Sequence, residues 1–135
     1  MLSYSTHGSG GKNPDLEKIH YVIDQIRQAH PDWVIDGEMQ LNFAMDKELR
    51  DEKYPFTRLK GLDVNTLLFP NLTSANASYK IVKSMVDEGE VIGPIQMGLN
   101  KPIHFTDFES SVRDIVNITA VAVLDAIVQE KKNGK

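Results

Sequence analysis

The sequence contains no cysteine among its 135 residues. This absence excludes disulfide bonds, thiolate metal sites and a cysteine nucleophile. The four histidines of the chain are His7, His20, His30 and His104. No two of them have the H-x-x-x-H spacing of a zinc site. We therefore predict no metal site in this chain.

Long apolar runs and clusters of one charge are also missing. No secretory signal and no uncharged apolar stretch of membrane-spanning length is present. The net charge is −4 and no run of Lys or Arg stands out, so we expect no nucleic acid and no membrane as partner. A single domain over residues 1–135, in a cytoplasmic protein, is the expectation from this length and composition.

Common catalytic and nucleotide-binding motifs are absent as well. The sequence has no G-x-S-x-G elbow, no G-x-G-x-x-G fingerprint and no P-loop. The loop Gly8–Lys12 is either a phosphate cradle made of backbone N–H groups or a flexible turn. Asp36 and Glu38 are either a pair for acid–base chemistry or a turn cap and a solvated acid, and the second reading is favoured because Gly37 interrupts the strand.

The stretch Val64–Gly89 is the most informative one that is present. Its apolar run Thr66–Phe69 predicts a buried strand that stops at Pro70. A helix should follow, capped by Thr73 and ended by Gly89, with one apolar stripe made of Ala75, Tyr79, Val82 and Val86. The turn between them lies at the carboxyl end of a strand, where open α/β sheets bind ligands.

Similar strand and helix signals occur along the rest of the chain. Further strands are predicted at Met1–Thr6, Trp33–Met39, Val91–Ile95 and Pro102–Phe105. Because the chain starts directly on a strand, we expect it to be a fragment of a longer protein. A helix should begin at Asn13 and Pro14 and end at Pro31, with a stripe of Leu16, Ile19, Ile23 and Ile26.

Between the second and third strands the signals are weaker. A short helix is predicted to carry Leu41, Met45 and Leu49. The polar segment Asp51–Asp63, with Pro55 and Gly61, reads as a surface loop.

The last predicted helix, Ser111–Lys131, is apolar around nearly its whole circumference. One stripe can pack on the sheet, and the other needs cover from another chain or domain. We expect this interface to include Ile118, Val121, Leu124 and Val128. The alternative is a central core helix of a monomer. Ser111 and Asp114 also fit a capping box at its start.

Several motifs follow one another in fixed order along the chain: Leu2-Ser3-Tyr4-Ser5, Gly8-Ser9, Asp36-Gly37-Glu38-Met39-Gln40, Arg58-Leu59-Lys60-Gly61, Phe69-Pro70-Asn71-Leu72, Ala75-Asn76, Ile92-Gly93-Pro94-Ile95, Gly98-Leu99 and Lys101-Pro102. This series resembles the C-terminal subdomain of the phosphate acetyl/butyryltransferase family. The resemblance covers nearly the whole chain and implies a three-layer α/β/α fold with a mostly parallel sheet, like that of isocitrate dehydrogenase. It also implies a cleft shared with a first subdomain, of which this chain would be the second.

Two branches of this family differ after the Lys101-Pro102 strand. Phosphotransacetylases carry a Ser-Arg-Gly triplet there and an acid seven residues past the Ser; here the Ser falls on Asp107, the Arg on Phe108 and the acid on Asp114. Losing the Arg removes the group that grips phosphate with two hydrogen bonds. The other branch is the C-terminal domain of bacterial NADP-dependent malic enzymes, which resembles this chain at Arg58–Gly61, His104, Val112–Asn117 and Val123–Ala126 and is the preferred one.

The resemblance to malic enzymes implies a regulatory domain that binds acetyl-CoA as effector and helps to form a homo-oligomer, at least a dimer. The NADP, the divalent metal and the conversion of malate to pyruvate would belong to upstream domains. The alternatives are the C-terminal half of a catalytic phosphate acetyltransferase and a purely structural assembly domain. The acyl-CoA contacts are expected at the turns after the strands and at the start of the last helix: Ser5, Thr6, Gly8, Ser9, Asp36, Asn71, Asn76, Gly93, Pro94 and Asp114.

Overall fold

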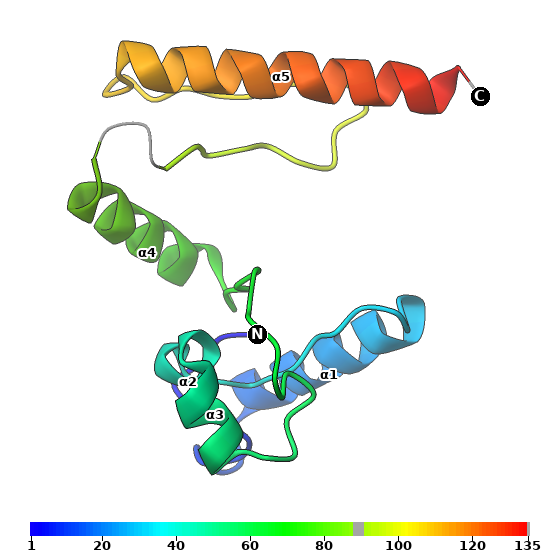
Figure 1. The fold of residues 1–135 in the computed structure, drawn as a ribbon, viewed down its shortest axis with the longest axis vertical. Coiled ribbons are helices and arrows are strands. Elements are labelled where there is room, and N and C mark those ends of the chain that lie inside the picture. Colours follow the sequence, from blue (N-terminus) through cyan, green and yellow to red (C-terminus); the bar gives the residue numbers. More distant parts are fainter. Residues whose placement is uncertain (88–90, 135) are drawn as a thin grey trace. The chain divides into compact units, whose positions relative to one another are not determined.

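The computed structural model describes residues 1–87 and 91–134. This part of the chain forms helices α1 (Pro14–Ala29), α2 (Leu41–Met45), α3 (Lys47–Lys53), α4 (Leu72–Met85) and α5 (Val112–Asn133), joined by extended segments and turns (Figure 1). The chain divides into two compact units, Met1–Ala77 and Ser78–Lys135, and the boundary falls within α4. None of the described helices is long and apolar enough to span a membrane.

Within residues 1–87 and 91–134, the predicted sheet is present only as three paired segments in the first unit. Leu2 and Met39 form an isolated parallel bridge. The N–H of Ser3 donates to the carbonyl of Met39 at 2.9 Å, and the N–H of Met39 donates to the carbonyl of Met1 at 3.1 Å. On its other side, the N–H of Leu2 donates to the carbonyl of Leu68 at 2.8 Å. The first segment therefore pairs with the second on one side and with the third on the other.

The prediction of regular strands is nevertheless wrong for residues 1–87 and 91–134, because none of them is in a strand. Glycines in the left-handed region interrupt two of the predicted strands, at Gly37 (φ 138°) and Gly93 (φ 144°). Pro94 and Pro102 lack the N–H that a ladder requires. The predicted strands that are not regular are Met1–Thr6, Trp33–Met39, Thr66–Phe69, Val91–Ile95 and Pro102–Phe105.

Helix α1 forms as predicted. The side chain of Asn13 accepts a hydrogen bond from the N–H of Asp15 at 2.8 Å, and Pro14 occupies the first turn. The stripe of Leu16, Ile19 and Ile23 is buried and packs against Met1 and Ile35. Burying each of these side chains is worth roughly 1.5–3 kcal/mol, so the stripe is what fixes α1 against the first unit.

The single helix predicted around Leu41, Met45 and Leu49 is wrong in one respect, because it divides at Asp46. The carboxylate of Asp46 accepts a hydrogen bond from the N–H of Leu49 at 2.9 Å and so starts α3 as a new helix. Leu41 and Met45 are exposed. A side-chain cap of this kind competes with the continuing helix for the same N–H groups.

The segment predicted as a surface loop after Asp51 is partly helical and partly buried. Helix α3 continues to Lys53, and Thr57 is buried. The reason is Arg50, whose fully buried guanidinium donates to the carbonyls of Ala44, Leu59 and Leu62. A buried charge needs several partners, and here they fold the segment after α3 back onto it.

The starts of the last two helices differ in how well the sequence predicts them. Thr73 lies inside α4, and the side chain of Asn71 accepts from the N–H of Ser74 at 2.9 Å instead, so the prediction of Thr73 as cap is wrong. No residue of α4 is buried. The predicted end at Gly89 lies outside the described residues. At α5 the predicted capping box of Ser111 and Asp114 is confirmed.

Candidate functional site

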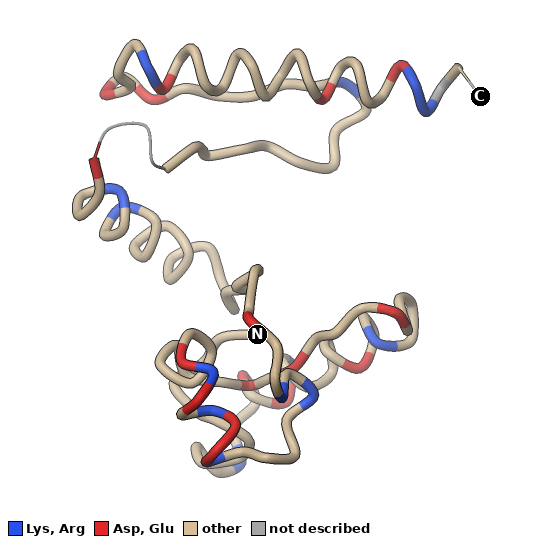
Figure 2. Tube along the Cα trace, viewed as in Figure 1, with Lys and Arg blue, Asp and Glu red and all other residues tan. Residues whose placement is uncertain are grey.

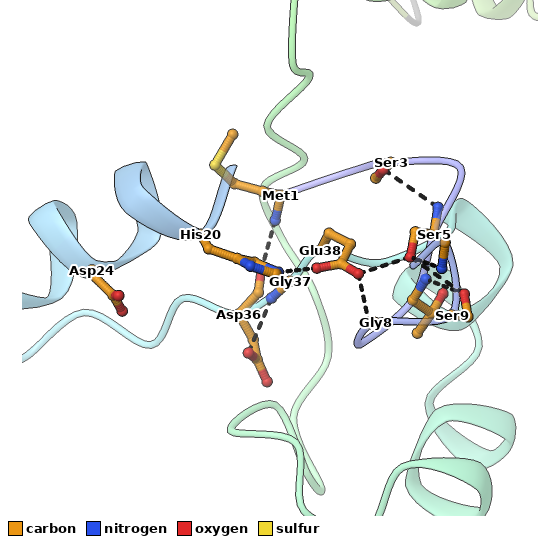
Figure 3. Close-up of polar contacts among 12 residues, drawn as sticks. Met1, Ser3, Ser5, Gly8, Ser9, His20, Asp24, Asp36, Gly37 and Glu38 are labelled. Carbon is orange, nitrogen blue, oxygen red and sulfur yellow. Dashed lines mark hydrogen bonds and ion pairs between the residues drawn. The ribbon is translucent and has the colours of Figure 1, made fainter. Parts of the chain in front are cut away.

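The best-defined polar cluster of the first unit surrounds the buried carboxylate of Glu38 (Figure 3). Its Oε1 accepts hydrogen bonds from the hydroxyl of Ser5 at 2.8 Å and from the N–H of Gly8 at 2.7 Å. Its Oε2 contacts the imidazole of His20 on α1. Burial alone raises the pKa of Glu38, but the hydrogen bonds from Gly8, Ser5 and His20 outweigh it and lower the pKa to about 2. Glu38 is therefore ionised and holds the loop that follows Ser5.

The loop itself uses its own backbone N–H groups. The N–H groups of Ser9 and Gly11 donate to carbonyls of the loop, and that of Gly10 donates to the hydroxyl of Ser5 at 2.8 Å. Together with the bond from Gly8 to Glu38, every N–H from Gly8 to Gly11 is occupied. This arrangement favours neither the phosphate cradle nor a flexible turn. It is an ordered turn whose backbone donors are already used.

Asp36, two residues before Glu38, fixes a second turn. Its Oδ2 accepts from the hydroxyl of Thr57 at 2.7 Å and from the N–H of Arg58 at 2.8 Å, and its Oδ1 lies 3.1 Å from Arg27 Nη2. Burial raises the pKa of Asp36, but the hydrogen bonds from Thr57, Arg58 and Gly37 outweigh it and leave the pKa below its ordinary value. Both acids are buried and ionised, which favours turn capping over acid–base chemistry and excludes a solvated acid.

Five of the predicted ligand contacts in the first unit thus make hydrogen bonds in or next to the turns held by Asp36 and Glu38. Ser5, Gly8, Ser9 and Asp36 bond as described, and Thr6 Oγ1 accepts from the N–H of Gln40 at 2.9 Å. Asn71 caps α4 through its side chain, and Asn76 is exposed on the same helix.

The remaining predicted contacts belong to the second unit. The carbonyl of Gly93 accepts from the hydroxyl of Tyr79 at 2.8 Å, and a cis peptide bond joins Gly93 to Pro94. Asp114 Oδ2 lies 3.2 Å from Lys83 Nζ. The N–H of Ser111 and the ammonium of Lys83 hold the pKa of Asp114 below its ordinary value. Asp114 therefore caps α5, and a ligand contact at this position stays a prediction.

Sequence reasoning missed the partners of the two buried acids. Thr57 was placed in an exposed loop, and His20 lies next to the apolar stripe of α1 without any local motif. These residues are separated from Asp36 and Glu38 by 21 and 18 positions, so no short pattern reports the pairing. The one sequence signal for these partners was that Asp36 and Glu38 lie in an otherwise apolar segment, where buried carboxylates need hydrogen-bond donors.

The positions where phosphotransacetylases carry Ser and Arg are also defined. The carboxylate of Asp107 lies 3.1 Å from Lys80 Nζ, which keeps the pKa of Asp107 below its ordinary value. Phe108 is fully exposed. Among the described residues no group of three or more His, Asp or Glu side chains is placed to hold a metal ion.

This geometry can be compared with known proteins. The Phosphate acetyl/butaryl transferase family matches residues 1–123, and the chain therefore belongs to this family. It is 36% identical over 126 residues to the NADP-dependent malic enzyme of Salmonella typhimurium, and this alignment covers 93% of the chain and 16% of the malic enzyme. It is 38% identical over 126 residues to the phosphate acetyltransferase of Clostridium acetobutylicum, and this alignment covers 93% of the chain and 37% of the acetyltransferase.

A solved structure shows the fold. The EutD phosphotransacetylase from Staphylococcus aureus superposes with a TM-score of 0.79 at 31% identity, over 93% of this chain and 38% of that one. The chain therefore has the phosphotransacetylase fold and spans well under half the length of these relatives. Malic enzymes and phosphate acetyltransferases match it about equally well, so identity alone does not separate the two branches.

Proposed function

We propose that this chain is the phosphotransacetylase-like C-terminal region of an NADP-dependent malic enzyme. In that role it binds acetyl-CoA as an effector and helps subunits to assemble. The oxidative decarboxylation of malate to pyruvate, with NADP and a divalent metal, belongs to other domains of the parent chain. The cluster around Asp36 and Glu38 then holds the binding turns in place and does no chemistry itself.

The observation that carries this proposal is the pair Asp107 and Phe108. A catalytic member of the family carries Ser and Arg at these positions. Here an ionised carboxylate, paired with Lys80, stands in place of the Ser, and an apolar ring stands in place of the Arg. A negative charge without the arginine fork repels a phosphate group instead of holding it. The region therefore keeps the family's fold without its means of gripping phosphate.

The surface of α5 supports a role in assembly. Several large apolar side chains of this helix are exposed, among them Val112, Val116, Leu124 and Val128. Figure 2 shows that the central turns of α5 carry almost no charge, while charged residues are spread over α1 and α3. An uncharged apolar face of this kind is typical of a protein–protein contact. Of the expected interface residues, Ile118 is buried and Val121 is half-buried.

The similarity to known proteins supports the alternative, a catalytic half of a phosphate acetyltransferase, to the same degree. The chain is as similar to phosphate acetyltransferases as to malic enzymes. The sequence of the full-length chain separates the two proposals, because a malic-enzyme region upstream supports the first and a transacetylase subdomain supports the second.

Calorimetric titration of acetyl-CoA into the protein tests the effector role. We expect saturable binding, and about five-fold weaker affinity in Asn76→Ala, since a neutral hydrogen bond contributes about 1 kcal/mol. Asn76 is preferred to Asn71 because the latter caps α4. Asn65→Ala, at another exposed asparagine, is the matched control. Absence of binding at millimolar acetyl-CoA contradicts the effector role.

A further inference from the structure

We propose that an aromatic and cationic surface of the first unit, made of His7, Tyr54, Phe56 and Arg58, binds the nucleotide end of the acyl-CoA. This inference rests on the proposed function and adds to it the place where a flat base and its phosphate are held. None of these four residues was among the predicted ligand contacts. All four belong to the unit Met1–Ala77.

The three rings form one cluster at the edge of the ordered loop. The ring centroids of His7 and Tyr54 are 5.2 Å apart, and those of His7 and Phe56 are 5.1 Å apart with the planes nearly perpendicular. Tyr54 and Phe56 also meet edge to face, at 6.0 Å. Edge-to-face contacts leave one flat face of a ring uncovered, and Phe56 is 69% exposed. The cluster therefore offers an open face on which a base can stack.

A backbone hydrogen bond and ring packing at His7 hold the aromatic cluster in place. The N–H of His7 donates to the carbonyl of Glu38 at 3.1 Å, which ties it to the buried acid. The Nε2 atom of His7 is buried and has no hydrogen-bond partner among the described residues, so ring packing holds its side chain. The exposed ring of Trp33 differs because one of its flat faces is already covered: it stacks on His30 with the ring centroids 4.1 Å apart. A preformed platform loses little conformational entropy on binding.

Arg58 supplies the charge that such a ligand requires. Its backbone N–H donates to the buried carboxylate of Asp36 at 2.8 Å, and it lies two residues from Phe56. The guanidinium groups of Arg27 and Arg50 in the same unit have carboxylate partners, whereas no carboxylate of residues 1–87 and 91–134 is within ion-pair distance of the Arg58 guanidinium. Since the loop N–H groups are occupied, a phosphate needs a side-chain cation, and a guanidinium is suited to it.

The probe for this surface is adenosine 3′,5′-bisphosphate, the nucleotide part of CoA without the phosphopantetheine arm. We expect it to bind the protein in calorimetric titrations. Phe56→Ala should weaken binding of the bisphosphate and of acetyl-CoA about ten-fold, as expected for loss of one stacked base. Arg58→Ala should weaken both ligands by a similar factor and make binding less dependent on salt. Circular dichroism checks that the variants fold.

Phe105→Ala and Arg113→Ala are the matched controls, at an exposed phenylalanine and an exposed arginine of the second unit, and should bind as the wild type does. If acetyl-CoA binds but Phe56→Ala and Arg58→Ala bind it normally, this inference is overturned and the effector role stands. If the bisphosphate binds through Phe56 but acetyl-CoA leaves the parent enzyme unregulated, the surface stands and the effector role fails. If neither ligand binds at millimolar concentration, both fail.

Discussion

Glu38 connects the loop that follows Ser5 to α1, because its carboxylate accepts from the hydroxyl of Ser5 and the N–H of Gly8 and contacts His20 of α1. Its sequence neighbour Asp36 does the same for Thr57 and Arg58. The sequence favoured a turn cap and a solvated acid at these two positions. The burial of both acids could not be predicted, because the donors that surround them come from distant segments.

Stability should depend on the ionisation of Glu38. The folded pKa of about 2 lies below the ordinary value of 4.5, so its ionised form stabilises the fold fully above pH 4.5. As the pH falls from 4.5 to 2, up to about 3 kcal/mol of that stabilisation is lost. Glu38→Gln should unfold more easily at neutral pH and lose this part of the acid dependence. Urea denaturation between pH 2 and pH 7 measures it, with Glu17→Gln as the exposed control; identical curves for both variants would contradict the assignment.

Gly37, between the two acids, gives a second prediction at this scale. It has φ 138°, and a Cβ there would lie 2.6 Å from the carbonyl oxygen of Met1. Gly37→Ala should therefore destabilise the fold by more than about 1 kcal/mol, since both the dihedral and the contact with backbone are unfavourable. Gly61→Ala is the control, because its φ is 74° but its Cβ meets nothing within 4 Å. Equal melting temperatures for the two variants would show that the contact with Met1 is not important.

At the scale of elements, local signals worked where the cause was local. The cap at Asn13 and the capping box at Ser111 each lie within a few residues of the groups they satisfy, and both were predictable. The break between α2 and α3 was missed because Asp46 can either continue a helix or start one. The segment around Thr57 was missed because its burial depends on Arg50, a long-range cause.

The capping box of α5 allows a direct test. Ser111→Ala removes the acceptor for the N–H of Asp114, and we expect a loss of about 1 kcal/mol in the stability of this helix. Ser84→Ala, at an exposed position inside α4, should cost much less. Hydrogen exchange of the first-turn amides of α5 is the measurement. Unchanged protection in Ser111→Ala would mean that the cap seen here contributes little.

At the scale of the whole molecule, the extended segments lie where the sequence predicted strands, but in residues 1–87 and 91–134 they do not form the predicted sheet. Pairing of Leu2 with Met39 and Leu68 joins residues far apart in sequence. A regular strand also needs neighbouring strands paired along its whole length. The pattern of apolar residues in the sequence does not show whether those neighbours are present. The apolar circumference of α5, by contrast, was a reliable indication of an exposed apolar face.

That face predicts a dimer of the protein. Leu124 is 62% exposed, so Leu124→Glu should leave the chain folded while placing a charge in an apolar contact. We expect light scattering to show a dimer for the wild type and a monomer for Leu124→Glu, with unchanged circular dichroism. Thr119→Glu puts the same charge on another exposed position of α5 and should remain dimeric. A wild type that is monomeric at tens of micromolar contradicts the dimer.

The central claim, a phosphotransacetylase fold kept for regulation and not for catalysis, is tested most directly by one assay. The full-length natural protein is incubated with acetyl phosphate and CoA, and formation of acetyl-CoA is followed, with the Clostridium acetobutylicum phosphate acetyltransferase as positive control. Because Asp107 and Phe108 replace the Ser and Arg that hold phosphate, we expect no turnover above the rate without protein. Turnover that depends on the protein would contradict the regulatory role and identify the chain as part of an acetyltransferase.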